Sequence, residues 1–278
     1  MPLAGLLAAL RAAPSRTGSV IVTIYGDAIA PRGGEVALAS LLELMAALDA
    51  GDGVVRTAVS RLARDGWLDR QRTGRRSFYR LSSHGVQEFA DAVPRIYGPL
   101  GGPWNGQLRL VFAEAGVERT MLERAGYALL APGVLVAPDA ALTPPPGTPA
   151  LLGAGTPGSM QAIAARAWPV ARVGAGYQRL VGLFDDLTEA AGSLPPLDAL
   201  AARVLLIHEY RRVALRDPRL PAGLLPADWP GVPARALCIR LYAALAPASE
   251  RWLDTAENGS GPLPRGPDPL ERFSGGGR

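Results

Sequence analysis

The sequence predicts an α+β protein of several domains, because three parts of the chain carry different patterns. Residues 19–92 combine apolar residues at helical spacing with an arginine-rich stretch of short alternating segments. Residues 103–163 alternate between strand-like and helix-like segments, and residues 164–255 are mostly helical in pattern. With 278 residues, 48% of them hydrophobic, the chain is long enough to bury more than one core.

The N-terminal part begins with a lead-in segment, residues 1–18, whose short apolar run lacks a preceding basic residue and favours an amphipathic helix over a secretory signal. In the domain expected over 19–92, the apolar segment SVIVTIYGDAIA ends at PRGGE, and EVALASLLELMAALD has helical spacing. A third helix is expected from Asp52 to Asp65, where Gly66 can stop it. WLDRQRTGRRSFYRLS then predicts two strands around a turn at Thr73 and Gly74.

The central segment, residues 103–163, predicts a small ferredoxin-like β-α-β domain. QLRLVFA alternates like a strand, GVERTMLERAG has the pattern of a short helix, and YALLAPGVLVAP indicates a further strand broken by Pro-Gly. LTPPPGTP is expected to be a rigid loop. GAGTPG, residues 153–158, fits G-x-G-x-x-G, but its proline and the helical context of the next acids favour a turn over a dinucleotide site.

The C-terminal part is expected to be a helical domain over 164–255 and a disordered tail over 256–278, because the tail is rich in Gly, Pro and polar residues. No stretch has the length and composition of a membrane helix. The single cysteine, Cys238, excludes an intrachain disulfide and fits a reducing compartment. Two histidines and one cysteine give little support to a zinc site. We therefore expect a cytoplasmic protein with no cofactor, no metal and no membrane partner.

The placement of arginine is informative, because all 29 basic residues are Arg and eight of them lie within residues 54–81, beside two acids. The net charge of +4 suits an anionic partner without requiring one. On a helical wheel over residues 54–64, one side is an apolar stripe, formed by Val55, Ala58, Val59 and Leu62. The other side carries guanidinium and hydroxyl groups, from Arg56, Thr57, Ser60, Arg61 and Arg64. Such a face suits the DNA major groove, where Arg can bond guanine edges.

The hairpin that follows carries further candidate DNA contacts at or beside its tip, namely Arg72, Arg75, Arg76 and Ser77. Cations around a glycine turn repel one another unless an anion lies between them, and a DNA backbone or minor groove provides one. Three helices followed by a basic hairpin predict a winged helix-turn-helix, in which the helix reads DNA and the hairpin clamps it. The alternative is a solvated arginine face on an ordinary small domain.

Several segments also resemble a known family. VTIYGDAIAPRGGEV, VVRTAVSRLARDGWL and GRRSFYRL resemble the N-terminal domain of the PaaX family, repressors of phenylacetic acid catabolism. HEYRRVALRDPRLPAGLLPADWPG resembles that family's C-terminal signature, and the central segment falls where the family carries a Cas2-like domain. The GDG at residues 51–53 departs from the usual pattern. The resemblance runs from residue 19 to residue 254.

The resemblance implies a transcriptional repressor that binds double-stranded operator DNA of an aromatic catabolic operon. It also implies release from DNA by an acyl-CoA effector, phenylacetyl-CoA in the best-known members. We expect a homodimer, because paired half-sites multiply a modest single-site affinity.

A CoA thioester needs cations for its phosphates, an aromatic surface and an apolar pocket. Groups of these kinds gather near the C-terminal signature, and the expected effector contacts are His208, Tyr210, Arg211, Arg212, Arg216 and Trp229. The alternative is structural: charged residues four apart on a helix commonly pair at the surface, and Trp229 can anchor a wrapping loop.

The second hypothesis is an enzyme, either a Cas2-like metal-dependent nuclease or an activity that processes acyl-CoA. Glu114 follows the strand QLRLVFA, where a Cas2-like nuclease would hold a metal, but a single glutamate without clustered acids is weak support. The sequence contains no convincing nucleophile and base, so we expect a regulator and not an enzyme.

Overall fold

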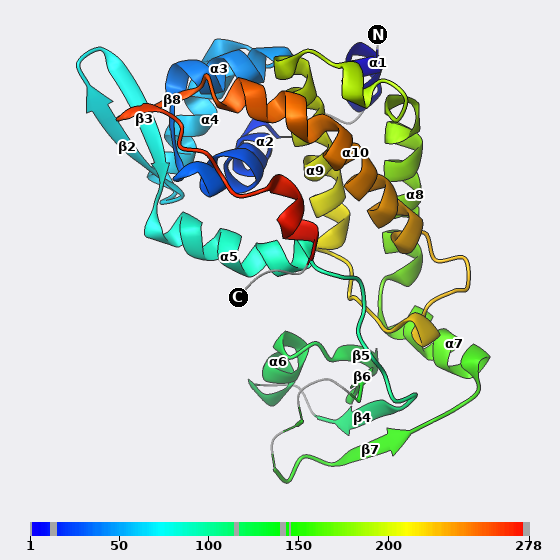
Figure 1. Ribbon diagram of the computed structural model, residues 1–278. Helices are drawn as coiled ribbons and strands as arrows, with labels where there is room; N and C mark the ends of the chain where they lie inside the picture. Colours follow the sequence, from blue (N-terminus) through cyan, green and yellow to red (C-terminus); the bar gives the residue numbers. More distant parts are fainter. Residues whose placement is uncertain (1, 12–15, 114–116, 140–142, 145, 275–278) are drawn as a thin grey trace. The chain divides into compact units, whose positions relative to one another are not determined.

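The computed structural model describes residues 2–11, 16–113, 117–139, 143–144 and 146–274 (Figure 1). Helices and sheets both occur, which confirms the α+β class. The chain divides into two compact units. The first unit contains Met1–Gly98, Arg179–Leu215 and Pro233–Arg278, and the second contains Pro99–Gln178 and Arg216–Val232. Each unit therefore combines segments that are far apart in the sequence.

The N-terminal part of the first unit consists of helices and a three-stranded sheet. Its helices are α1 (Pro2–Arg11), α2 (Thr17–Ile24), α3 (Leu38–Ala47), α4 (Asp52–Arg64) and α5 (Ser83–Tyr97). A π-helical turn, η1 (Tyr25–Ile29), and a 3-10 turn, η2 (Ala30–Arg32), extend α2. The strands are β1 (Glu35–Ala37), β2 (Leu68–Thr73) and β3 (Arg76–Leu81), antiparallel in the order β1-β3-β2.

The position of α4 follows from its amphipathic pattern. Val55 and Val59 are fully buried, and α4 packs against α2 and α3. Asp52 lies in the first turn of α4, where its charge complements the helix dipole. Gly66 has a φ of 78°, a conformation that favours glycine, so it ends the helical segment as the sequence predicts.

The C-terminal helices share the core of the first unit with these N-terminal helices. The first unit also contains η3 (Asp185–Leu187), η4 (Ala191–Ser193), α9 (Pro196–Ala214) and most of α10 (Gly231–Leu253). Every residue from 199 to 210 is buried, and α9 packs against α2, α3 and α5. Cys238 is also buried, as its apolar flanks predict. Because α9 is buried on all sides along this stretch, it needs packing partners on every side, and helices of the N-terminal segment provide some of them. The segments 19–92 and 164–255 therefore pack together in one unit.

A buried ion-pair network connects the distant segments of the first unit. Nε of Arg203 in α9 donates to Oδ2 of Asp27 at 2.7 Å, and its Nη1 donates to Oε1 of Glu250 at 2.6 Å. The hydroxyl groups of Tyr97 and Tyr242 donate to Oδ1 of Asp27 at 2.8 and 3.0 Å. Asp27 and Arg203 are 1% and 2% exposed, so neither charge is hydrated by bulk water. The hydrogen bonds and ion pairs of this network replace that hydration.

The C-terminal tail differs from its sequence-based prediction. Residues 256–274 contain β8 (Glu257–Asn258) paired with β9 (Gly261–Pro262), and η6 (Pro269–Ser274). Phe273 is 8% exposed, and its ring centroid lies 5.1 Å from that of Tyr97 and 5.2 Å from that of Tyr242. Arg272 donates to the backbone and side chain of Asp27. The prediction of disorder is wrong for 256–274. It rested on the average composition of the tail, which gives no information on the contacts that Arg272 and Phe273 make.

The second unit contains a four-stranded antiparallel sheet in the order β5-β6-β4-β7. Its strands are β4 (Leu108–Phe112), β5 (Ala128–Ala131), β6 (Val134–Pro138) and β7 (Ala150–Gly153). Its helical segments are α6 (Val117–Arg124), α7 (Pro157–Ala167), part of α8 (Val170–Phe184) and η5 (Ala222–Leu224). The predicted strand over 127–138 is thus a hairpin of two strands, and β7 was not predicted. The segment 153–158, where a turn was predicted, contains the end of β7, three residues without regular structure and the start of α7, which Thr156 caps.

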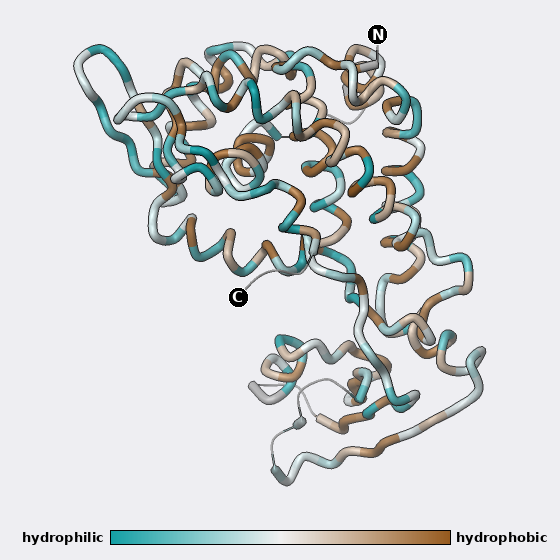
Figure 2. Tube along the Cα trace, in the orientation of Figure 1, coloured by the Kyte–Doolittle hydropathy of each residue, from teal (hydrophilic) through white to brown (hydrophobic). Residues whose placement is uncertain are grey.

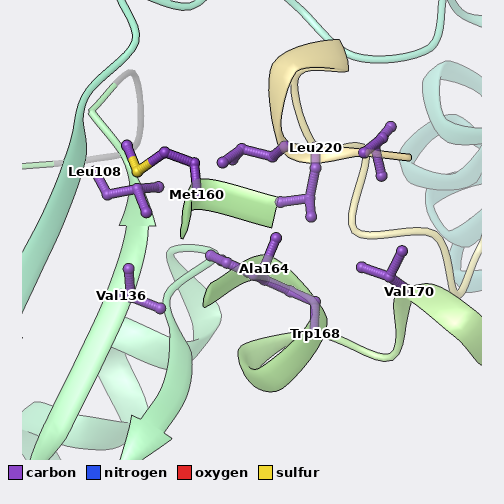
Figure 3. Packing of buried hydrophobic residues seen from close by; sticks show 9 residues of the cluster. Leu108, Val136, Met160, Ala164, Trp168, Val170 and Leu220 are labelled. Carbon is purple, nitrogen blue, oxygen red and sulfur yellow. The ribbon is translucent and has the colours of Figure 1, made fainter. Parts of the chain in front are cut away.

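Both faces of this sheet are covered. Met160, Ala164 and Trp168, in and just after α7, pack against Leu108 and Val136 of the sheet (Figure 3). Neighbouring residues in the strands point the other way, and there Val111, Leu135 and Ala137 pack with Leu122 of α6. This alternation is the period of two that predicted β4 and β6. No helix in the described part of the chain is long and apolar enough to span a membrane.

Candidate nucleic-acid interface

The polar face of α4 is exposed along its length. Arg56, Thr57, Ser60, Arg61 and Arg64 are all exposed, on the side opposite the buried valines. The hydroxyl of Thr57 donates to the carbonyl of Gly53 at 2.8 Å, which leaves its oxygen able to accept. Nε of Arg61 lies 3.5 Å from a carboxylate oxygen of Asp65, a solvent-exposed pair that an incoming phosphate can displace at small cost. The structure thus brings the five predicted residues onto one accessible helix face.

The β2–β3 hairpin carries the second predicted group. Arg72, Arg75 and Arg76 are exposed, and Gly74 at the turn has a φ of 60°. Nε of Arg72 donates to the carbonyl of Gly74 at 3.1 Å. Figure 2 shows that hydrophilic residues predominate along this hairpin. We call β2, β3 and their turn the wing.

Two residues of this surface were missed by the sequence-based reasoning. Arg70 donates from Nη2 to Oγ of the half-buried Ser77 at 3.2 Å. Arg70 lies two positions before Arg72 and therefore on the same face of the strand. The strand alternation in the sequence could have identified Arg70 as part of this surface. Glu257 from the tail lies 2.9 Å from Nη1 of Arg76. No local pattern could indicate that pair, because the tail returns to the wing only in the folded chain.

The six predicted effector residues differ in burial and in their partners. His208 and Tyr210 are each 1% exposed within α9, and Nη1 of Arg212 pairs with Glu209 at 2.9 Å. Arg216 and Trp229 belong to the second unit, where the ring of Trp229 meets that of Tyr177 at 6.0 Å. Arg211 is half-buried and lines a cavity of the first unit. Among the four of these residues in the first unit, burial and pairing thus leave Arg211 as the best placed for a ligand.

The imidazole of His208 is part of the packing between α9 and α2. Its Nδ1 lies 2.8 Å from Oγ1 of Thr23. Burial, together with the positive charges of Arg211 and Arg212, lowers the pKa of His208 to about 3. His208 is therefore neutral at neutral pH and offers no charge to a phosphate.

Acidification is expected to lower the free energy of unfolding through His208. The unfolded histidine has a pKa of about 6.5, so the unfolded chain takes up this proton first as the pH falls. The contribution of the neutral imidazole is complete above about pH 6.5 and is lost progressively toward pH 3, which amounts to about 2 kcal/mol at pH 5. Urea unfolding of wild type and His208→Gln at about pH 7.5 and about pH 5 should show the steeper decline in the wild type. Equal declines would contradict this assignment.

The described residues contain no group of three or more His, Cys, Asp or Glu side chains arranged to hold a metal ion. Glu114, the candidate metal ligand of the nuclease hypothesis, lies outside the described residues.

Comparisons with known proteins give a consistent result. Residues 16–85 match the family of PaaX-like proteins, and residues 168–255 match the C-terminal domain of PaaX-like proteins. The chain is 36% identical over 294 residues to the transcriptional repressor PaaX of Escherichia coli (strain K12). This alignment covers 96% of this chain and 93% of that protein. Among solved structures, the uncharacterized protein Rv0674 from Mycobacterium tuberculosis aligns with a TM-score of 0.52 at 23% identity. That alignment covers 77% of this chain and 90% of the other, and it shows a shared fold.

Proposed function

This chain belongs to the family of PaaX-like proteins, and we propose that it is a transcriptional repressor that binds operator DNA and is released by an acyl-CoA. Its relative from Escherichia coli, similar along nearly the whole chain, is named as a transcriptional repressor. A repressor acts by binding and has no need of a catalytic centre. The proposed site of action is cytoplasmic DNA.

The arrangement of α4 and the wing is the observation that carries the DNA-binding proposal. We assign α2, α3 and α4 with the β1-β3-β2 sheet to a winged helix-turn-helix, in which α4 enters the major groove and the wing contacts the backbone. The polar face of α4 has Arg56 and Arg61 for base edges, with Thr57 and Ser60 small enough to allow close approach. The exposed arginines of the wing supply charge for phosphates.

The second unit has part of the ferredoxin-like pattern. The order β4-α6-β5-β6 matches the first four of the six elements of the β-α-β-β-α-β arrangement, and all neighbouring strands of this sheet are antiparallel. Among the described residues no helix separates β6 from β7. We propose that this sheet derives from a ferredoxin-like domain that has lost its second helix.

A homodimer is the assembly that we propose for operator binding. β7 is an edge strand, and its Leu151 and Leu152 are 61% and 52% exposed. An unprotected edge with large apolar side chains is a typical surface for pairing with a second chain. Two copies would present two α4 helices to paired half-sites.

Fluorescence anisotropy with DNA from upstream of the gene and its neighbours tests this function, with and without phenylacetyl-CoA. Specific binding that the thioester abolishes is the expected result. Binding that ignores phenylacetyl-CoA but responds to another acyl-CoA would keep the repressor and change the ligand. The absence of specific binding at moderate salt would overturn the proposal.

A further inference from the structure

A cavity of about 790 Å³ lies between α2 and α4 in the first unit. Val54, Ala58 and Leu62, on successive turns of α4, form one wall, and Val22 of α2 lies opposite. Trp67, just after α4, also lines the cavity. This volume is that of a pocket for a small organic ligand, and these side chains make its walls mainly apolar.

The polar groups of the cavity favour an anion. Arg16, Arg61 and Arg211 line it, against one acid, Asp65. Nη2 of Arg211 donates to the carbonyl and the hydroxyl of Ser19 at 2.9 and 2.8 Å. Three guanidinium groups around apolar walls therefore select a ligand that has an apolar body and a negative charge.

Arg211 is half-buried, and protein groups satisfy its guanidinium only in part. Its Nε is buried and has no hydrogen-bond partner among the described residues, and no carboxylate of that part of the chain forms an ion pair with it. Burial lowers the pKa of Arg211, and the neighbouring Arg212 lowers it further. A half-buried guanidinium without a carboxylate partner loses hydration that its hydrogen bonds to Ser19 offset only in part, and the negative charge of an anion in the cavity would stabilise it.

The cavity and the proposed DNA-binding face share two residues of α4. Thr57 and Arg61 line the cavity and also belong to the exposed polar face, whereas Arg56, Ser60 and Arg64 do not line it. A guanidinium that turns toward a ligand in the cavity is withdrawn from the groove. An occupant that widens the contact between α2 and α4 also moves the helix that reads DNA.

We propose that the cavity between α2 and α4 is a ligand site for an anionic molecule with an apolar acyl body, and that ligand and DNA exclude each other because both need Thr57 and Arg61. This inference rests on the proposed repressor function, and it assigns the site and the mode of release. Two sources share this chemistry, a free carboxylate and a CoA thioester, and the cavity accepts the acyl group of either.

The test uses the full chain with phenylacetate and phenylacetyl-CoA as separate probes in calorimetric titrations without DNA. Val22→Trp fills the cavity from α2, and Arg211→Met removes the buried charge while keeping the aliphatic stem; neither residue belongs to the proposed DNA contacts. Val86→Trp is the matched control, because Val86 on α5 is 55% exposed and does not line the cavity. Whichever probe binds the wild-type protein should bind both cavity variants at least about tenfold more weakly, and it should bind Val86→Trp with wild-type affinity.

Anisotropy on the operator supplies the second readout. The apparent Kd for DNA should rise without limit as the probe concentration rises. Both cavity variants should lose this response, and Arg211→Met, which leaves the cavity unfilled, should retain DNA affinity within about twofold. A plateau would show a complex of protein, DNA and ligand, and would overturn mutual exclusion. Wild-type ligand affinity in both cavity variants, or no binding of either probe to wild type, would overturn the site. Failure to bind operator in every variant, with calorimetric binding intact, would instead count against the repressor function.

Discussion

Replacing Arg203 with methionine is expected to lower the free energy of unfolding by about 3–5 kcal/mol. The substitution keeps most of the side-chain volume but removes the guanidinium that contacts Asp27 at 2.7 Å and Glu250 at 2.6 Å. Asp27 is 1% exposed, so its carboxylate would lose a buried cation without gaining water. Urea unfolding followed by circular dichroism measures the change.

A surface pair provides the matched control for this prediction. Nε of Arg119 and Oε1 of Glu123 lie 2.9 Å apart, but their side chains are 36% and 44% exposed. Arg119→Met should therefore change the free energy of unfolding by less than about 1 kcal/mol. The double substitution of Arg203→Met with Asp27→Leu should be less costly than the two single losses added together, because neither member of the Arg203–Asp27 pair is then left buried without the other. If Arg203→Met were as mild as Arg119→Met, the network would contribute no net stability.

This network explains why the N-terminal and C-terminal segments share a unit. Asp27 follows α2, Arg203 lies in α9, and Arg272 reaches the same carboxylate from the tail. Their separations in sequence exceed the range of any helical or strand period. Sequence patterns could predict α4 and the wing because a helical stripe and a strand alternation are local. They could not predict which distant arginine meets Asp27.

The predicted effector residues show a second limit of local patterns. His208 and Tyr210 have side chains of types that suit a nucleotide ligand. The type of a side chain, however, does not indicate whether that side chain is buried in the folded protein. The better signal was the run from Ala199 to Ile207, which is apolar on every side of the helix except at Arg203 and is typical of a core helix. The cavity that Arg211 lines is formed by three helices that pair only in the folded chain, so its walls could not be found from spacing.

The largest effect on function is expected from the polar face of α4. Arg56→Ala and Arg61→Ala should each weaken operator binding by about 1–3 kcal/mol and reduce discrimination against unrelated DNA, because each loss removes contacts with base edges. Arg75→Ala and Arg76→Ala should weaken binding to all sequences alike. Each should also lower the slope of log affinity against log salt by about 0.9, the value for one phosphate contact. Anisotropy titrations on operator and unrelated DNA at several salt concentrations separate the two patterns.

The ion pair between Arg76 and Glu257 gives this experiment an internal control. Glu257→Gln removes the carboxylate that lies 2.9 Å from Nη1 of Arg76 and leaves the arginine in place. Because that arginine no longer has to exchange a protein carboxylate for a phosphate, Glu257→Gln should strengthen binding to operator and unrelated DNA by the same factor. Arg76→Ala and Glu257→Gln thus act in opposite directions on general affinity, and neither should alter discrimination. A loss of discrimination in either variant, or a uniform loss in Arg56→Ala and Arg61→Ala, would show that reading and clamping are not divided between α4 and the wing.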